Sequence, residues 1–217
     1  MILQISDILT QTECATIGEV LDADSLWRDG KATAGGAAKA VKANLQADPQ
    51  IPAVKGVLKK IQMAIEANTV FKAAAQPSRF ARLILSRYQS SMEYGDHVDA
   101  AYIDGVRADI SFTLFLSNPD DYDGGELVID STGSTDTIKA PAGSLVLYPS
   151  TAVHRVEAVK KGERLACVGW VESRIRSQEH RSVLFDLERT LTADISEKQT
   201  RLQLLNIRNN LLRIFGN

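Results

Sequence analysis

The chain has 217 residues, of which 44% are hydrophobic, and a formal net charge of −2. This length and apolar content suit one large domain, or one domain with helical additions. Lys and Arg are dispersed and give no excess of positive charge, which disfavours nucleic-acid binding. No stretch approaches the ~18 apolar residues of a membrane span, and the opening MILQISDILT lacks the pattern of a signal peptide. We therefore expect a cytoplasmic protein that binds neither nucleic acid nor membrane.

Cys14 and Cys167 are the two cysteines of the chain. They form neither a disulfide framework nor a C-x-x-C pair, which favours a reducing compartment. We expect each to be a small, buried, apolar side chain.

Residues 1–77 are predicted to form a helical region that packs on the core. Thr10 followed by Glu13 is a capping-box pattern ahead of an apolar helical stripe, and a second helix fits residues 52–68. Between these helices lies WRDGKATAGGAAKAVKANLQ, residues 27–46. Its glycines and small residues predict a long loop or a broken helix packed on the main domain, and a substrate-facing lid is the alternative.

Residues 78–173 have the sequence pattern of a β domain. Short runs rich in Ile, Leu, Val, Phe and Thr alternate with turn signals such as NPDDYDGG, STGS, APAG and KKGE. The runs are FARLILSRY, ADISFTLFLS, GELVID, DTIKA, GSLVLYP, AVHRVEAV and RLACVGWVES. Many short strands without intervening helices indicate a sandwich or jelly roll. The predicted fold class is mostly β with flanking helices, α+β.

Residues 174–217 form a helical extension in this prediction. A first helix has apolar residues at helical spacing from Val183 to Leu191, and a longer helix covers roughly residues 196–215. This last helix either packs on the β-core or supplies the surface of a homodimer.

His97 and Asp99 form an H-x-D pattern in EYGDHVDAAY. Residues i and i+2 of a strand project to the same side, so both side chains can aim at one point. An imidazole and a carboxylate suit a divalent first-row metal, and a second histidine would complete the two-histidine, one-carboxylate set that binds Fe(II). The pattern alone is weak evidence, because acidic residues are common.

Two further histidines could complete this set. His154, in AVHRVEAV, shares the more apolar, inward side of its strand with Val156 and Ala158. His180, in SQEHRS, lies near the start of a helix among charged residues and is interpreted as a surface histidine. We therefore predict His154 as the third metal ligand.

Arg164 opens the strand RLACVGW, ten residues after His154. If Ala166, Val168 and Trp170 face the interior, Arg164 points into the same space. A guanidinium in an apolar pocket is costly without a partner, and its planar fork matches a carboxylate. Pairing with an internal Asp or Glu, or reversed faces of the strand, are the alternatives.

Three longer stretches resemble the Fe(II)- and 2-oxoglutarate-dependent dioxygenases of the prolyl 4-hydroxylase-like group. They are RYQSSMEYGDHVD, RADISFTLFLSNPDDYDGGELVI and GSLVLYPSTAVHRVEAVKKGERLACVGW. The segment from residue 27 to residue 46 and the tail NNLLRIFG narrow the resemblance to the bacterial PKHD-type hydroxylases. This resemblance implies a double-stranded β-helix, or jelly roll, at residues 78–173.

The resemblance also implies a site and its cofactors. By this resemblance, His97, Asp99 and His154 bind the iron. Arg164 binds the distal carboxylate of 2-oxoglutarate, and Tyr88 lines the cosubstrate pocket. The cofactors are Fe(II) and 2-oxoglutarate, with L-ascorbate as a further candidate. The family reaction consumes O2, hydroxylates a C–H bond and releases succinate and CO2.

Several neighbouring residues carry weaker signals. The glycines at positions 124 and 125 suit a tight turn with positive φ, and Glu126 after them is more easily explained by structure than by catalysis. Tyr94 and Asp109 lie in family-like motifs without an assigned role.

The substrate stays open between a peptidyl or amino-acid side chain and a siderophore-related small molecule, the latter with a role in iron uptake or homeostasis. Two other readings remain. One is a cupin-like metalloenzyme that does not use 2-oxoglutarate, and the other is a non-catalytic module that senses metal or 2-oxoglutarate.

Overall fold

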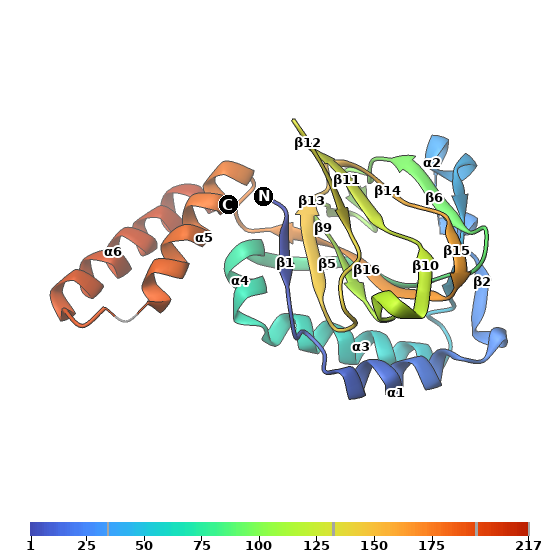
Figure 1. Cartoon of the computed structure of the whole chain (residues 1–217). Helices are drawn as coiled ribbons and strands as arrows, with labels where there is room; N and C mark the ends of the chain where they lie inside the picture. Colours follow the sequence, from blue (N-terminus) through green and yellow to red (C-terminus); the bar gives the residue numbers. More distant parts are fainter. Residues whose placement is uncertain (34, 132, 194, 217) are drawn as a thin grey trace.

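Two antiparallel sheets face each other, helices cover the outer face of one sheet, and a helical hairpin projects from one end (Figure 1). The computed structural model describes residues 1–33, 35–131, 133–193 and 195–216. The predicted class, a β sandwich of the jelly-roll type with helices at both ends, is confirmed by this architecture.

The larger sheet has seven strands. In spatial order they are β1 (Leu3–Ile5), β13 (Leu145–Pro149), β9 (Ile110–Phe115), β16 (Arg164–Ser173), β5 (Pro77–Tyr88), β4 (Leu45–Ala47) and β2 (Trp27–Asp29). The smaller sheet has the order β12 (Ser134–Ile138), β11 (Leu127–Ser131), β14 (Val153–Val156), β6 (Glu93–His97) and β3 (Lys42–Ala43). Two separate pairs are β7 (Tyr102–Ile103) with β8 (Val106–Arg107), and β10 (Tyr122–Gly124) with β15 (Val159–Gly162).

Three helices pack on the outer face of the larger sheet. They are α1 (Gln11–Leu21), α3 (Pro52–Ala67) and α4 (Thr69–Ala75). The predicted capping box of Thr10 and Glu13 begins α1, and the Asn68 side chain caps α4. The apolar stripes of these helices meet the strands in the main core cluster, so the helices hold one face of the sheet rigid.

Strand alternation divides the side chains of the larger sheet between the two layers. In β16, Leu165 and Cys167 join the helix-facing core, whereas Val168 and Trp170 line the cavity between the sheets. Arg164 shares this inner side by the same alternation. The side of β16 that the sequence analysis considered to face the interior, with Arg164, Val168 and Trp170, therefore does face the space between the sheets.

Residues 27–47, which we call the strap, differ from the prediction. They contain β2, the short helix α2 (Gly36–Ala40), β3 and β4 in place of a loop or broken helix. β4 pairs with β5 of the larger sheet and β3 pairs with β6 of the smaller one, so the strap joins the two sheets along one edge. Residues 1–77 are thus partly β. The sequence analysis missed these strands because the segment is rich in small residues. Such short strands depend on pairing with partners that are distant in sequence.

The turn at Gly124 and Gly125 has the positive φ angles expected from the sequence, +75° and +68°. A Cβ on Gly124 would lie 2.1 Å from the carbonyl oxygen of Ala158, so glycine is required there. Glu126 contributes its backbone carbonyl, which accepts a hydrogen bond from the N–H of Glu157 at 2.9 Å.

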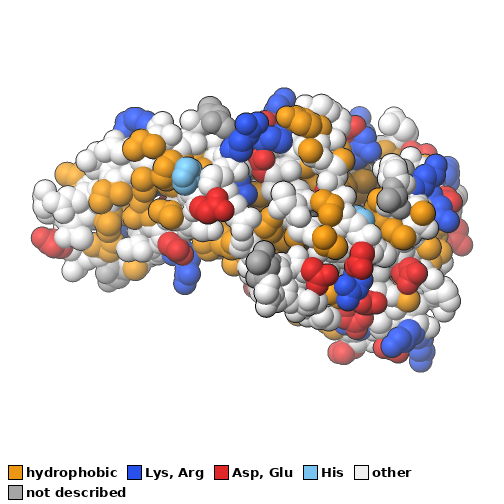
Figure 2. Space-filling view, turned by 90° about the horizontal axis from the view of Figure 1, so that it is seen from above, with side chains coloured by type: hydrophobic (Ala, Val, Ile, Leu, Met, Phe, Trp, Pro, Cys, Tyr) orange, Lys and Arg blue, Asp and Glu red, His pale blue; other side chains and the backbone are white. Residues whose placement is uncertain are grey.

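The C-terminal extension is an antiparallel hairpin of α5 (Gln178–Thr192) and α6 (Lys198–Phe215). Of the two alternatives for the last helix, packing on the β-core is wrong, because α6 packs along α5 and projects away from the sheets (Figure 1). Hydrophobic side chains gather on the surface of this hairpin, at the left of Figure 2. The four most exposed large apolar residues of α6 are Leu202, Leu205, Ile207 and Ile214.

Cys14 and Cys167 are free and buried, as expected. Burial raises the pKa of the Cys14 thiol to about 11, so it is unreactive at neutral pH. Among the described residues, no helix is both long enough and apolar enough to cross a membrane.

Asp109 is a structural residue in this fold. Its carboxylate accepts two hydrogen bonds of 2.8 Å from Arg107 and one of 2.9 Å from the N–H of Ser173. The Arg107 guanidinium also donates to the carbonyl of Ser173 at 3.0 Å. Asp109 therefore joins the start of β9 to the end of β16, next to the helical hairpin.

We predict that Asp109→Ala lowers the free energy of unfolding by about 3 kcal/mol, because it leaves Arg107 and the Ser173 N–H without their main acceptor. Chemical denaturation measures the change. Asp123→Ala removes an exposed carboxylate and is the control, expected within about 0.5 kcal/mol of the unaltered protein. Equal stability of the two variants would contradict the structural role of Asp109.

Candidate active site

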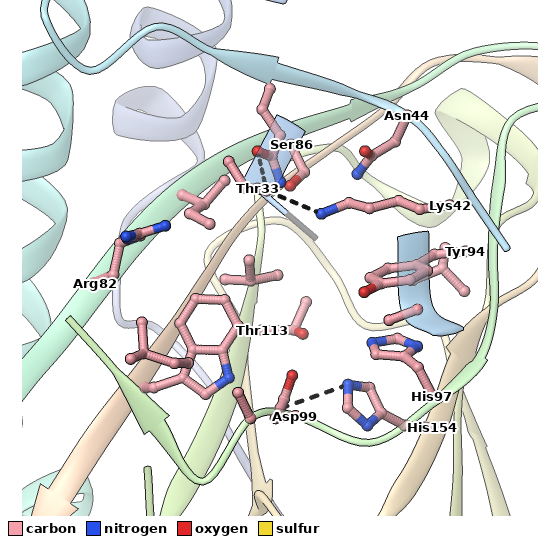
Figure 3. A pocket seen from close by; sticks show the side chains of 18 of the residues that line it. Thr33, Lys42, Asn44, Arg82, Ser86, Tyr94, His97, Asp99, Thr113 and His154 are labelled. Carbon is pink, nitrogen blue, oxygen red and sulfur yellow. Dashed lines mark hydrogen bonds and ion pairs between the residues drawn. The ribbon is translucent and has the colours of Figure 1, made fainter. Parts of the chain in front are cut away.

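A cavity of about 380 Å³ lies between the two sheets. Its walls come from β5, β6, β9, β14 and β16, and the strap closes one side (Figure 3). Polar side chains from the strap and from β6 point into it, while Ile84, Leu127, Val168 and Trp170 supply apolar surface. The strap therefore lines the cavity, as the lid alternative required.

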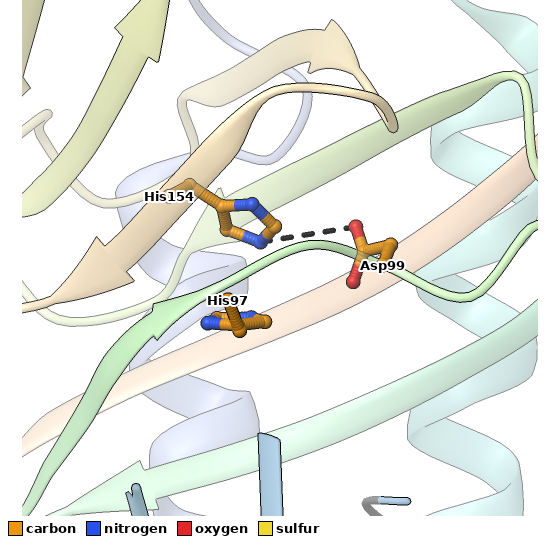
Figure 4. A group of neighbouring side chains, drawn as sticks. All are labelled: His97, Asp99 and His154. Carbon is orange, nitrogen blue, oxygen red and sulfur yellow. Dashed lines mark ion pairs between the residues drawn. The ribbon is translucent and has the colours of Figure 1, made fainter. Parts of the chain in front are cut away.

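His97, Asp99 and His154 meet at one end of this cavity (Figure 4). Each offers one ligand atom, and these atoms lie within 4.8 Å of one another. His97 ends β6, Asp99 lies in the following loop, and His154 lies on β14 directly opposite His97 in the strand pairing. The structure thus brings together the three residues that the sequence singled out as metal ligands.

Backbone carbonyls orient both imidazoles. The Nδ1 of His97 lies 2.8 Å from the carbonyl oxygen of Gly95, and the Nδ1 of His154 lies 3.1 Å from that of Ala152. A carbonyl only accepts hydrogen bonds, so each Nδ1 carries the proton and donates it. Each Nε2 is left with a free lone pair, which is the form that a metal needs.

Two serines orient the carboxylate of Asp99. The hydroxyl of Ser111 donates a hydrogen bond of 2.6 Å to Oδ2 of Asp99, and the hydroxyls of Ser111 and Ser150 are 2.8 Å apart. Both serines are buried. No sequence pattern pointed to either serine, because only the pairing of β9 with β13 brings them together.

Burial, and to a lesser extent the nearby His154, lower the pKa of His97 to about 4. His97 is therefore neutral at physiological pH and can bind a metal without first losing a proton. Two imidazoles and one carboxylate are the donor set of a divalent first-row metal with open coordination positions.

Asp96 and His180 are excluded from this group by position. Asp96 turns outward and forms an ion pair of 3.3 Å with Arg155. His180 stacks on the ring of Phe215 in the helical hairpin, with 3.7 Å between ring centroids. His180 is half-buried in this contact and lies outside the metal-ligand group, whereas the sequence analysis interpreted it as a surface histidine.

Arg164 is the largest fully buried side chain, with 1% of its surface exposed. None of its three guanidinium nitrogens has a hydrogen-bond partner, and within the described ranges no carboxylate lies within 4.0 Å of it. It lies between the rings of Tyr88 and Phe115, 5.3 and 5.1 Å from their centroids. Tyr88 itself lines the cavity. A buried cation without an anion is costly, so this position fits a ligand carboxylate.

Other cavity residues were missed by the sequence analysis. Tyr94 stacks on His97, with ring centroids 3.6 Å apart, and supports the imidazole from one side. Lys42, Asn44 and Gln46 of the strap are buried and line the cavity. Their spacing of two, in KANLQ, is the alternation of a strand and was the available signal.

Comparison with known proteins supports this chemistry. Residues 83–172 match the family model of the 2OG-Fe(II) oxygenase superfamily. A PKHD-type hydroxylase of Picosynechococcus is 42% identical over 220 residues, covering 100% of both chains. Another, from Acaryochloris marina, is 45% identical over 188 residues, covering 87% of this chain and 85% of the other.

Among solved structures, the fold is similar to that of a prolyl hydroxylase from Trichoplax adhaerens. The TM-score is 0.59 at 13% identity, covering 89% of this chain and 87% of the other. A viral collagen prolyl hydroxylase from Paramecium bursaria Chlorella virus-1 gives a TM-score of 0.55 at 20% identity, with coverage of 79% and 96%. Identities this low bear on the fold alone. The full-length relatives decide the family: the chain belongs to the PKHD-type hydroxylases of the 2OG-Fe(II) oxygenase superfamily, and it is a 2-oxoglutarate-dependent dioxygenase.

Proposed function

We propose that this enzyme hydroxylates a small molecule at an Fe(II) ion held by His97, Asp99 and His154, with 2-oxoglutarate anchored by Arg164. The observation that carries the proposal is the unpaired, fully buried guanidinium of Arg164 behind the cavity that holds the His/Asp/His group. A metalloprotein without a diacid cosubstrate would have no use for that buried charge.

The residues present fit both cofactors. The two Nε2 atoms and the Asp99 carboxylate form a donor set for Fe(II), and the guanidinium of Arg164 offers a planar fork to the distal carboxylate of 2-oxoglutarate. Bound iron and 2-oxoglutarate supply the oxidising chemistry, which consumes O2 and releases succinate and CO2. The protein contributes orientation: Ser111 holds Asp99, Tyr94 supports His97, and the apolar walls limit the access of water.

The cavity favours a metabolite over a polypeptide. Its volume of about 380 Å³ is near the lower limit of small-ligand sites, and it must hold 2-oxoglutarate as well as the substrate. The strap closes the side where an extended peptide would need an open groove. A siderophore-related molecule, with a role in iron homeostasis, belongs to this class. A cytoplasmic setting is part of the proposal, because two buried free cysteines suit a reducing compartment.

Asp99→Ala is expected to weaken Fe(II) binding by at least about 100-fold and to abolish iron-dependent succinate formation, since one of three ligands is lost. The fold should survive, because among the described residues Ser111 is the one hydrogen-bond partner of the Asp99 side chain. Calorimetric metal titration and succinate assays, with and without L-ascorbate, measure both effects.

Asp96→Ala is the matched control for this variant. It removes the neighbouring carboxylate, which points outward to Arg155, and should keep both iron and activity. Full activity of Asp99→Ala would overturn the assignment of the metal ligands.

Arg164→Met is expected to have opposite effects on stability and on cosubstrate binding. It keeps much of the side-chain volume and removes an unpaired buried charge, so the ligand-free protein should gain thermal stability. The requirement for 2-oxoglutarate should rise by about 100-fold or more, with iron binding unchanged.

Thermal melts with and without 2-oxoglutarate test this directly, because the cosubstrate should stabilise the unaltered enzyme and leave Arg164→Met unaffected. Arg155→Ala, which removes an arginine outside the cavity, should respond like the unaltered enzyme. An unchanged requirement for 2-oxoglutarate in Arg164→Met would show that another residue holds the diacid. Turnover that needs no 2-oxoglutarate would favour the cupin-like enzyme, and 2-oxoglutarate that binds but is never consumed would favour the sensor.

We further propose that the helical hairpin forms a homodimer. Ile207 and Ile214 are seven residues apart and lie on one side of α6, whereas Leu202 and Leu205 lie on another. All four are exposed, between 37% and 70%. A second copy of the hairpin would cover apolar surface that α5 leaves open.

The double variant Ile207→Glu, Ile214→Glu is expected to be a monomer, whereas the unaltered protein and the control Gln203→Glu are dimers. Light scattering coupled to size exclusion gives the masses, and circular dichroism checks that α6 is intact. A monomeric unaltered protein at micromolar concentration would refute the dimer.

A further inference from the structure

Lys42 is a buried cation that the iron and 2-oxoglutarate sites do not use. It lies on β3 of the strap, is 6% exposed and lines the cavity. Its ammonium group lies 3.2 Å from the hydroxyl of Thr33 and 4.8 Å from the centroid of the Tyr94 ring (Figure 3). In the described part of the chain, no carboxylate lies within 4.0 Å of it. Its neighbours are therefore a hydroxyl and an aromatic face.

Strand pairing places Lys42 beside the metal group. Lys42 is opposite Tyr94 in the pairing of β3 with β6, and Tyr94 stacks on His97 of the same strand. The ammonium group and the imidazole are thus on opposite sides of one tyrosine ring (Figure 3). A ligand held by Lys42 lies close to the metal position.

The strap offers more than one polar group to such a ligand. Asn44 and Gln46 share the cavity side with Lys42, and both are buried. The Oδ1 atom of Asn44 has no partner, and Oε1 of Gln46 accepts a hydrogen bond of 2.7 Å from Thr33. The NH2 groups of these two amides donate hydrogen bonds and can contact an anion, whereas their oxygens cannot.

Charges around the cavity balance without Lys42. Fe(II) and Arg164 together carry three positive charges, and Asp99 with the two carboxylates of 2-oxoglutarate carries three negative ones. Arg82, near the cavity mouth, is already paired with Asp104. Burial lowers the pKa of the Lys42 ammonium to about 8, so this group keeps its charge at neutral pH. With both cofactors bound, Lys42 is the surplus cation.

We propose that Lys42 binds a carboxylate of the primary substrate, and that this enzyme acts on a small carboxylate-bearing molecule. The inference rests on the proposed function, because it takes iron and 2-oxoglutarate as occupants of the other end. Through Lys42 the strap recognises the substrate and orients its C–H bond towards the metal. The amide of Asn44 supplies a further contact for the same molecule.

Calorimetric titration of the anaerobic Fe(II)- and 2-oxoglutarate-loaded enzyme tests the proposal, with N-acetylglycine as the carboxylate probe and N-acetylglycinamide as its neutral counterpart. The unaltered enzyme should bind the carboxylate at least about tenfold more tightly than the amide. Lys42→Met should lose that preference, and Lys42→Arg should retain it. Lys39→Met, which removes an exposed lysine of the strap, is the matched control and should behave like the unaltered enzyme.

Three results would overturn the proposal. The first is no preference for the carboxylate in the unaltered enzyme, and the second is an undiminished preference in Lys42→Met. The third is a weaker affinity of Lys42→Met for 2-oxoglutarate, which would make Lys42 a cosubstrate ligand. A purely structural role would alter the melting temperature of Lys42→Met and leave its probe preference unchanged, which is the second result.

Failure of the proposed function gives a different outcome. The enzyme would then not take up Fe(II) and 2-oxoglutarate in the loading step that precedes the probe. The same probe titration on the metal-free protein still compares Lys42→Met with the unaltered chain, so the contribution of Lys42 is measured in either case.

Discussion

The pairing of β14 with β6 is the constraint on which the site depends. It sets His154 directly opposite His97, and on its other side His154 is opposite Ile129 of β11. A slip of one residue in either ladder would turn the imidazole to the outer face. Two ladders therefore fix one side chain, and the loop after β6 has only to return Asp99 to the same point. The strand register therefore brings His97 and His154 together, and the backbone hydrogen bonds of the ladders fix the positions of the two imidazoles.

The same strand, β6, also pairs with β3 on its other edge, so three neighbouring strands carry groups of the candidate site. β14 supplies His154, β6 supplies His97 and Tyr94, and β3 supplies Lys42. Because the strap continues into β4 of the larger sheet, its position is tied to both layers. A segment held in this way is better described as a fixed wall than as a mobile cover. Such a wall suits recognition, since a rigid cation loses little entropy when it binds an anion.

Local patterns predicted much of this fold, and long-range pairing accounts for what they missed. The capping box at Thr10 and the alternation of β16 are properties of a few adjacent residues, so the sequence reveals them directly. The short strands of the strap gain their stability from β5 and β6, which lie about 40 to 50 residues away along the chain. Likewise, the apolar pattern of α6 shows that the helix has a partner without identifying it, and the partner is α5 and not the sheets. The histidines of the site were predictable by their types, but the serine that orients Asp99 was not.

Buried cations distinguish structural from functional positions in this chain. Arg87, on the outer side of β5, pairs with Asp24 at 2.9 Å and Glu163 at 3.3 Å. Arg181 donates to the backbone carbonyls of Ile175 and Arg176, which precede α5. Both guanidinium charges have partners within the described chain, so a structural role accounts for their burial. Arg164 and Lys42 are similarly buried, yet within the described ranges no carboxylate lies within 4.0 Å of either side chain. Since a folded protein retains such costs only where something offsets them, these two cations mark the positions where we propose that its anionic ligands bind: the cosubstrate behind Tyr88, and the molecule that is oxidised beside Tyr94.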